Sequence, residues 1–233
     1  MWFKRLYRTL FFRGGHGIHS PFVFDLITTV IEELCPFYCY DQLYHIRWRL
    51  LQNQRMITIN HRNMSVKKAL TTYGFTEQED RLLFRLSNRF RPKRTLALGS
   101  DFGLTPLYLT AYATDTSCVV IEPEPSIAAI AAEVLIKNTF GTVDLRNSME
   151  DIPYNIDLLV TGHHFPFAFE EMLSHLHDHS IMVIAGINMS RERRETWKQI
   201  CSHPKVTVTI DLLRLGIVFF NPKLHQQTYY SIL

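Results

Sequence analysis

Apolar and polar positions follow two different patterns along this 233-residue chain. Up to about residue 90 the apolar residues recur at helical spacing, which predicts amphipathic helices. The third of these helices begins after Thr76, and Glu79 three residues later completes a capping box. The polar, irregular stretch 53–75 is interpreted as a lid or a loop. The helices are expected over 22–34, 41–52 and 77–90.

After Pro92, short apolar runs alternate with helical segments, which predicts a parallel sheet with crossover helices. Two further apolar runs, 205–211 and 215–220, lie too close together for a crossover helix and must form an antiparallel hairpin. The pattern therefore predicts a seven-stranded mixed sheet over about 91–220, with the 215–220 strand antiparallel between its neighbours. Strands are expected near 94–98, 117–122, 142–146, 156–161 and 180–185, and helices near 105–113, 125–137, 167–177 and 190–201.

The first predicted strand of this sheet runs into a turn with glycine at positions 99 and 103. Glycine lets the backbone pass close to a ligand where a Cβ atom would clash. The second strand ends at Glu122, and a carboxylate there can accept hydrogen bonds from two ribose hydroxyls. Strand, glycine turn, helix and strand with a terminal acid are typical of the first half of a doubly wound nucleotide-binding sheet.

Composition indicates a folded protein, with 46% apolar and 20% charged residues. The net charge of +3 is too small to indicate a nucleic-acid partner. No uncharged apolar window approaches the length of about 18 residues that a membrane span needs, and nothing resembles a signal peptide. For the aromatic and basic residues 1–13, packing onto the body of the protein or a homodimer contact is favoured over a membrane-surface anchor. Four scattered cysteines are read as reduced thiols of a cytoplasmic protein: Cys35, Cys39, Cys118 and Cys201.

Two segments carry a resemblance that covers nearly the whole chain. They read Gly15-His16-Gly17-Ile18-His19-Ser20-Pro21-Phe22-Val23-Phe24 and His203-Pro204-Lys205-Val206-Thr207-Val208-Thr209-Ile210-Asp211. Together with the glycine turn and its acid, they resemble a group of uncharacterised bacterial class I S-adenosylmethionine-dependent methyltransferases. That group is typical of Bacteroidetes and is similar to O-methyltransferases. The resemblance implies a Rossmann-like domain over 91–233 after a helical extension or lid over 1–90, with S-adenosyl-L-methionine as the cofactor.

The same resemblance implies a set of cofactor-binding residues along one edge of the sheet: Gly99, Ser100 and Gly103 around the methionine moiety, Glu122 on the ribose, Pro123, Ser148 and Met149 around the adenine, and Thr161 after the fourth strand. Several of them have a structural alternative. The glycines would also suit any tight turn, Glu122 could cap the next helix, and Met149 could belong to the core.

At four positions this chain lacks carboxylates that such relatives carry around the pocket: Ala97, Thr161, Ala185 and Gly186. In metal-dependent O-methyltransferases the carboxylates after the fourth and fifth strands bind a divalent ion, which lowers the pKa of an acceptor hydroxyl. No metal site is therefore expected. His163 and His164, at the carboxyl end of the fourth strand, remain as catalytic candidates, because a neutral imidazole can take a proton from a hydroxyl. A histidine pair that only lines a loop is the equal alternative.

The leading interpretation is a metal-independent methyltransferase that acts on a small molecule. Methyl transfer mainly requires that the methyl group be positioned against a nucleophile, so loss of the metal does not forbid it. A catalytically inactive relative with a binding or scaffold role is the alternative, on the ground of the four missing carboxylates. A nucleic-acid methyltransferase is disfavoured, because no Asn/Asp-Pro-Pro-Tyr-like motif follows the fourth strand.

Overall fold

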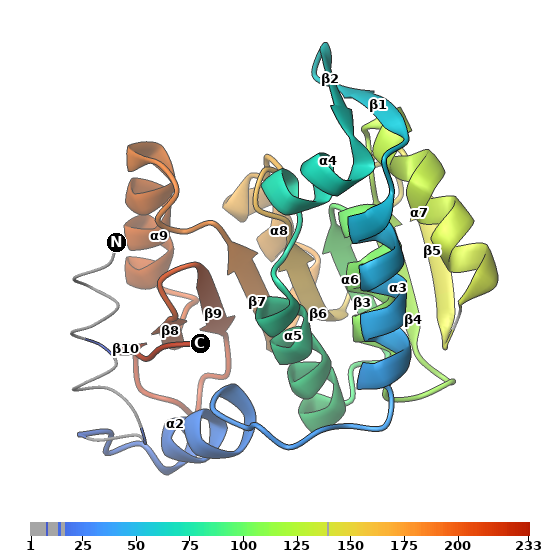
Figure 1. Ribbon diagram of the computed structural model, residues 1–233. Coiled ribbons are helices and arrows are strands. Elements are labelled where there is room, and N and C mark those ends of the chain that lie inside the picture. Colours follow the sequence, from blue (N-terminus) through green and yellow to red (C-terminus); the bar gives the residue numbers. More distant parts are fainter. Residues whose placement is uncertain (1–7, 9–13, 15–16, 139) are drawn as a thin grey trace.

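A mixed sheet with helices on both faces forms the centre of the computed structural model, which describes residues 8, 14, 17–138 and 140–233 (Figure 1). In this part of the chain the sheet has eight strands in the order β10-β8-β9-β7-β6-β3-β4-β5. Their bounds are β3 Arg94–Leu98, β4 Ser117–Ile121, β5 Thr142–Arg146, β6 Ile156–Thr161, β7 Leu176–Ala185, β8 Val208–Asp211, β9 Leu215–Phe219 and β10 Gln227–Tyr230.

The terminal hairpin lies where the sequence pattern predicts it. Strand β9 is antiparallel to both of its neighbours, β7 and β8, and the other pairs in the sheet are parallel. The predicted strand number of seven is wrong, because β10 adds an eighth strand parallel to β8. This short strand carries little apolar patterning of its own, and it covers an edge of β8 that would otherwise have no partner.

The pleat of each central strand divides its side chains between two apolar layers. In β3, Leu96 and Leu98 pack against α8 and α9, whereas Ala97 faces the layer that contains α2 and α5. Strand β6 repeats the division: Leu159 packs in the layer of α8 and α9, and Leu158 packs in the layer of α2 and α5. Because both faces are covered, the central strands read as continuous apolar runs.

The helices surround the sheet, and Figure 1 shows α3 and α5 running side by side on one of its faces. Among the described residues their bounds are α2 Pro21–Leu26, α3 Tyr40–Gln52, α4 Val66–Tyr73, α5 Glu77–Phe90, α6 Leu104–Thr110, α7 Pro125–Lys137, α8 Phe169–Leu173 and α9 Arg191–Ser202. The capping box at the start of α5 is confirmed, with Thr76 and Glu79 each bonded to the other's backbone. None of the described helices is long and apolar enough to cross a membrane.

The stretch 53–75, interpreted from its polar, irregular sequence as a lid or a loop, folds into a hairpin followed by α4. Strands β1 (Met56–Ile59) and β2 (Arg62–Ser65) pair antiparallel. The two turn residues between them, Asn60 and His61, both adopt left-handed φ values of 48° and 63°. A two-residue hairpin turn needs this conformation, which Asn-Gly signals far more clearly than Asn-His does. The signal for the hairpin was therefore weak in the sequence.

Two predicted helices are shorter than expected. The segment 22–34 continues beyond α2 only as a π-helix, Ile27–Ile31, where the Thr28 hydroxyl bonds the carbonyl of Phe24 at 2.9 Å. Hydroxyl groups that bond back to the preceding turn compete with the regular helical pattern. Helix α8 ends at Leu173, so the histidine-rich segment after it begins β7 instead of ending a helix. The Ser180 hydroxyl donates to the carbonyl of Ile156 at 2.6 Å and fixes this longer strand to β6.

Close packing between β9 and α9 predicts a stability effect at Gly216. A Cβ atom there would lie 2.5 Å from the ring of Trp197, nearer than real Cβ contacts allow. We expect Gly216→Ala to lower the free energy of unfolding by about 1–3 kcal/mol, as overpacking of a core does. Urea denaturation measures the change. The same substitution in a Trp197→Leu background should cost less, and equal costs in both backgrounds would contradict this account.

Candidate functional site

The carboxyl ends of β3, β4 and β6 meet at the point where the strand order reverses, which is the ligand-binding edge of an open α/β sheet. The turn after β3 is unusual, since Gly99, Asp101, Phe102 and Gly103 all have left-handed φ values between 46° and 99°. Two of them are not glycines, and such strained backbone is concentrated at functional sites. The local conformation therefore supports this edge as the site.

The two glycines of the turn have different surroundings. At Gly99 a Cβ atom would have no neighbour closer than 3.7 Å, and this residue lines a cavity. At Gly103 a Cβ atom would lie 3.1 Å from both the carbonyl oxygen of Ala131 and the Cβ atom of Val134 in α7. Close helix packing thus explains Gly103, whereas Gly99 borders the cavity and has a φ of 99°, a conformation that favours glycine.

Glu122 follows β4 directly, and its side chain is tied to the glycine turn. Its Oε2 atom accepts hydrogen bonds from the backbone N–H and the hydroxyl of Ser100, at 3.0 and 2.8 Å, and its Oε1 atom accepts from the N–H of Glu124 at 3.2 Å. A carboxylate offers about four acceptor directions, so one remains free here. Rotation of the Ser100 hydroxyl would release a second.

A cavity of about 210 Å³ lies at this edge and brings together five of the predicted site residues. These five are Gly99, Glu122, Pro123, His163 and His164. The N-terminal region contributes Ile59 and Asn60 of the β1–β2 hairpin, Tyr73 at the end of α4, and Phe75 beyond it. Residues far apart in the sequence thereby enclose one space.

The other predicted cofactor residues do not line this cavity. Ser100 and Thr161 are fully buried, and the Thr161 hydroxyl lies 3.3 Å from the backbone N–H of Ala185, from which it accepts a hydrogen bond. Ser148 is exposed, and Met149 packs against the apolar layer of α8 and α9.

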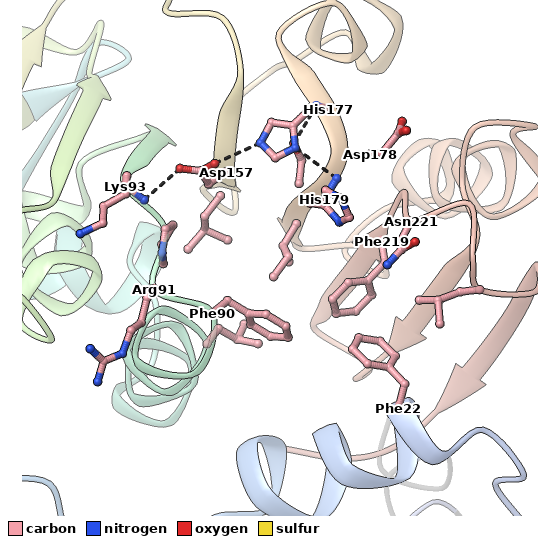
Figure 2. Close-up of a pocket in the computed structure, with 16 residues that line it drawn as sticks. Phe22, Phe90, Arg91, Lys93, Asp157, His177, Asp178, His179, Phe219 and Asn221 are labelled. Carbon is pink, nitrogen blue, oxygen red and sulfur yellow. Dashed lines mark hydrogen bonds and ion pairs between the residues drawn. The ribbon is translucent and has the colours of Figure 1, made fainter.

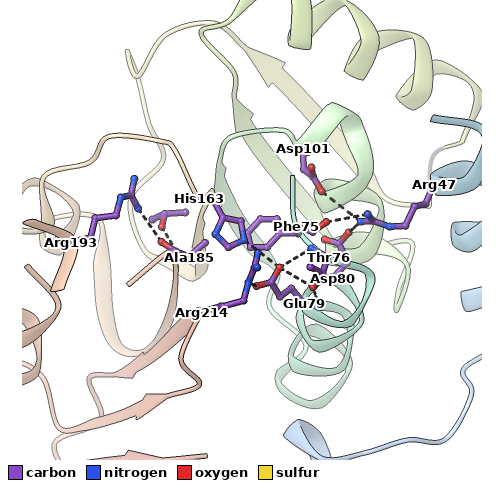
Figure 3. Close-up of polar contacts among 11 residues, drawn as sticks. Arg47, Phe75, Thr76, Glu79, Asp80, Asp101, His163, Ala185, Arg193 and Arg214 are labelled. Carbon is purple, nitrogen blue, oxygen red and sulfur yellow. Dashed lines mark hydrogen bonds and ion pairs between the residues drawn. The ribbon is translucent and has the colours of Figure 1, made fainter. Parts of the chain in front are cut away.

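His163 belongs to a buried polar cluster that the sequence did not reveal (Figure 3). Its Nε2 atom lies 3.3 Å from Oε2 of Glu79, and Nε of Arg214 donates to Oε1 of the same carboxylate at 2.8 Å. The Glu79 and His163 side chains are only 2% and 3% exposed. Burial raises the pKa of Glu79, but the hydrogen bond and charge from His163, the N–H of Thr76 and the charge of Arg214 outweigh it and hold the pKa at about 2. Glu79 is therefore a carboxylate at neutral pH.

The imidazole of His163 has one nitrogen with a partner and one without. An ionised Glu79 favours the tautomer in which Nε2 carries the proton, which leaves a lone pair on Nδ1. That Nδ1 atom is buried and has no hydrogen-bond partner among the described residues. Unpaired buried polar atoms are costly, so this atom marks a place where a ligand group would be stabilised.

A second charged cluster joins the N-terminal region to the glycine turn (Figure 3). Arg47 of α3 forms an ion pair with Asp80 of α5, donates to the carbonyl of Phe75 at 3.1 Å, and lies 3.8 Å from Asp101 of the turn. Burial raises the pKa of Asp80, and burial together with the Asp80 charge raises that of Asp101 well above its usual range. One guanidinium thus lies close to two buried carboxyl groups, both of which have raised pKa values.

His164 follows His163 in the loop after β6, and unlike His163 it is exposed. Its ring contacts that of Tyr73, with the centroids 5.0 Å apart, at the 210 Å³ cavity. Partial burial lowers the pKa of His164, so its imidazole is neutral at pH 7. The structure therefore separates the two adjacent histidines, one buried against Glu79 and one at the surface.

A second cavity of about 640 Å³ adjoins the first, and Phe75 and His163 line both. Its other walls come from α3 and α4, from Gly186 and Asn188 after β7, and from Arg214 of the β8–β9 turn. The larger cavity therefore lies between the N-terminal region and the sheet edge.

A third cavity, of about 340 Å³, lies at the opposite edge of the sheet (Figure 2). Phe22, Phe90 and Phe219 gather on one side of it. On the other, Nε2 of His177 bonds Asp157 at 3.0 Å, and its Nδ1 atom accepts from the N–H of His179 at 3.1 Å. Both ring nitrogens of His177 thus have partners. No group of three His, Cys, Asp or Glu residues suited to a metal ion occurs in the part of the chain that the structure describes.

Comparison with solved structures shows the fold of class I methyltransferases. The chain is similar to an O-methyltransferase of tomaymycin synthesis from Streptomyces achromogenes, crystallised with S-adenosylmethionine, at 13% identity and a TM-score of 0.56 over 85% of this chain and 95% of that one. The chain is also similar to an O-methyltransferase from Bacillus cereus in complex with S-adenosylhomocysteine, at 13% identity and a TM-score of 0.55 over 82% of this chain and 94% of that one. A methyltransferase from Geobacter sulfurreducens is similar at 17% identity and a TM-score of 0.54 over 63% of this chain and 80% of that one.

Neither a family model nor a curated protein sequence matches the chain. The predicted Rossmann-like methyltransferase fold is confirmed by the structures, whereas the narrower bacterial group stays a prediction.

Proposed function

We propose that this protein is an S-adenosylmethionine-dependent methyltransferase that acts on a small molecule without a metal ion. The observation that carries the proposal is the meeting of Gly99 and Glu122 in one cavity at the switch point of the sheet. The fold supports it, since similar structures hold S-adenosylmethionine or S-adenosylhomocysteine. A cytoplasmic location and the absence of a nucleic-acid partner remain part of the same proposal.

The residues of the first cavity fit this cofactor. Glu122 retains a free acceptor direction for a ribose hydroxyl and gains a second when the Ser100 hydroxyl turns away. Pro123 and Ile127 offer apolar surface beside it for the adenine, and Gly99 leaves the backbone open to the methionine moiety. Contacts from Ser148, Met149 and Thr161 stay predictions of the resemblance.

The cofactor, when bound, supplies an electrophilic methyl group. In that chemistry the hydroxyl oxygen of the acceptor would take the methyl group, and the electron pair of the broken carbon–sulfur bond would stay on sulfur. His163 is suited to take the hydroxyl proton on Nδ1, because Glu79 holds its other nitrogen. Glu79 is then a positioning residue that also stabilises the imidazolium. His164 is the second candidate for the base.

Calorimetric titration with S-adenosylhomocysteine tests the proposal. Binding in the micromolar range or tighter is expected of an enzyme that must hold its cofactor, roughly −8 kcal/mol. No detectable binding would overturn it. That result would favour the second candidate function, an inactive relative with a binding or scaffold role, which the replacement of four pocket carboxylates supports.

Metal dependence gives one prediction. Hard cations need several oxygen ligands, and by the resemblance Thr161, Ala185 and Gly186 stand where metal-dependent relatives carry carboxylates. We expect EDTA to leave cofactor binding and turnover unchanged, as measured by calorimetry and by transfer of a radiolabelled methyl group. Turnover that EDTA abolishes and magnesium restores would contradict it.

The two histidines give another prediction, because the structure separates them. We expect His163→Ala to reduce turnover by about 10²–10⁴-fold, the usual contribution of a general base, with little change in cofactor affinity. His164→Ala serves as the matched control and should cost less. Turnover assays with calorimetric controls compare them. A larger loss from His164→Ala would assign the base to the surface histidine.

A further inference from the structure

The larger cavity is the natural place for the methyl acceptor, if the proposed function holds. It adjoins the cofactor cavity through Phe75 and His163, so an acceptor within it would reach the imidazole. Its volume of about 640 Å³ suits a small organic molecule. Its apolar walls include Leu51, Leu70 and Met189.

Arg214 is the distinctive charged group of this cavity. Its backbone carbonyl accepts a hydrogen bond from the N–H of Gly186 at 2.7 Å, so it lies directly beside a position where the resemblance expects a metal-binding carboxylate. Its Nε atom is held by Glu79, and the side chain remains 51% exposed. Neither of its two terminal nitrogens has a hydrogen-bond partner among the described residues. A guanidinium fixed through Nε still presents these two nitrogens for a planar anion.

The remaining charges of the cavity do not oppose an anion there. Arg47 is already paired with Asp80, and Glu79 accepts hydrogen bonds on both of its oxygens. No Asp or Glu residue lines the cavity in the part of the chain that the structure describes. Arg214 thus lines this cavity with no carboxylate in the described part of its wall, whereas Glu77 and Glu79 line a neighbouring cavity that Arg214 also borders.

We propose that the methyl acceptor is a hydroxy acid, with its carboxylate bound by Arg214 and its hydroxyl directed to His163. The two groups suit a single small molecule because Arg214 and His163 both contact the Glu79 carboxylate, which keeps them close together. The unpaired Nδ1 atom of His163 gives the hydroxyl a buried partner. Arg214 thereby determines specificity and is distinct from the base.

The test uses the full chain saturated with S-adenosylhomocysteine and two probes, 4-hydroxybenzoate and its neutral analogue 4-hydroxybenzamide. Ligand-observed NMR titration measures both affinities. The acid should bind roughly tenfold more tightly than the amide, because charge-assisted bonds to a guanidinium exceed neutral ones. Arg214→Gln should remove this preference and Arg214→Lys should keep part of it. Arg194→Gln, which removes an exposed arginine of α9, is the matched control and should leave the preference intact.

Each outcome separates this inference from the proposed function. If the protein binds S-adenosylhomocysteine but binds the two probes equally, the hydroxy-acid assignment fails while the methyltransferase proposal stands. A preference for the acid that survives Arg214→Gln also overturns it. If Arg214→Gln fails to fold, added sodium chloride tests the inference in the unchanged protein. Because salt screens the attraction between a guanidinium and a carboxylate, it must weaken binding of 4-hydroxybenzoate and leave binding of 4-hydroxybenzamide unchanged. Failure to bind S-adenosylhomocysteine itself counts against the proposed function.

Discussion

Replacing Arg47 by methionine is expected to destabilise the protein by about 3–5 kcal/mol, because breaking a buried ion pair leaves an uncompensated buried charge. Asp80 is fully buried, and Asp101 shares the same guanidinium. Arg47 belongs to α3, whereas Asp101 belongs to the glycine turn, so the same change would loosen the N-terminal region from the site. Urea denaturation followed by circular dichroism measures the loss.

The pH dependence of this variant gives a second readout. Without the guanidinium the two buried carboxyl groups favour their neutral form, so their pKa values in the folded state lie above those in the unfolded state. Such groups stabilise the fold below the unfolded pKa, and that contribution is lost as pH rises through the folded value. The variant should therefore be least impaired at acid pH.

An exposed ion pair supplies the control for Arg47. Arg55 and Glu133 are 2.8 Å apart, with side chains 54% and 58% exposed, so Arg55→Met should cost less than about 1 kcal/mol. If Arg47→Met were no more costly than Arg55→Met, the buried cluster would have no special role in stability.

Replacing Glu122 by alanine is expected to weaken binding of S-adenosylhomocysteine by about 1.5–3 kcal/mol, the range for hydrogen bonds to a charged group. By the usual conversion this is roughly a 10- to 100-fold rise in Kd. Glu122 is 6% exposed, and its carboxylate orders the turn through Ser100, so the variant loses both a direct contact and support for the turn at Gly99. Calorimetric titration measures the affinity.

Two comparisons make the Glu122 result specific. Glu122→Gln keeps one carbonyl acceptor and should lose less affinity than the alanine variant. Glu133→Ala removes an exposed carboxylate of α7, remote from the cavity lining, and should leave the affinity unchanged. Unchanged affinity in Glu122→Ala itself would remove this residue from the cofactor site.

The sequence by itself determined the sheet and its ligand edge. The alternation of apolar runs with helical segments gave β3 to β7 their order along the chain, and the close spacing of the last two runs required the antiparallel β9. Such signals are local, since they depend on periodicity and on the length of each connection. Gly99 and Glu122 were predicted in the same way, because each follows the end of a predicted strand, and both line one cavity in the structure.

Only the tertiary structure decided how the charged groups of the site are combined. Glu79 appeared in the sequence as a capping residue of α5, and the fold places its carboxylate between His163 and Arg214, which are 84 and 135 positions away along the chain. Arg47 carried no recognisable motif at all. Contacts of this kind depend on how helices pack against the sheet edge, and no local pattern encodes that geometry. Local patterns thus specify the central strands β3 to β9, whereas the packing of the N-terminal region over the sheet fixes the partners of the buried charges.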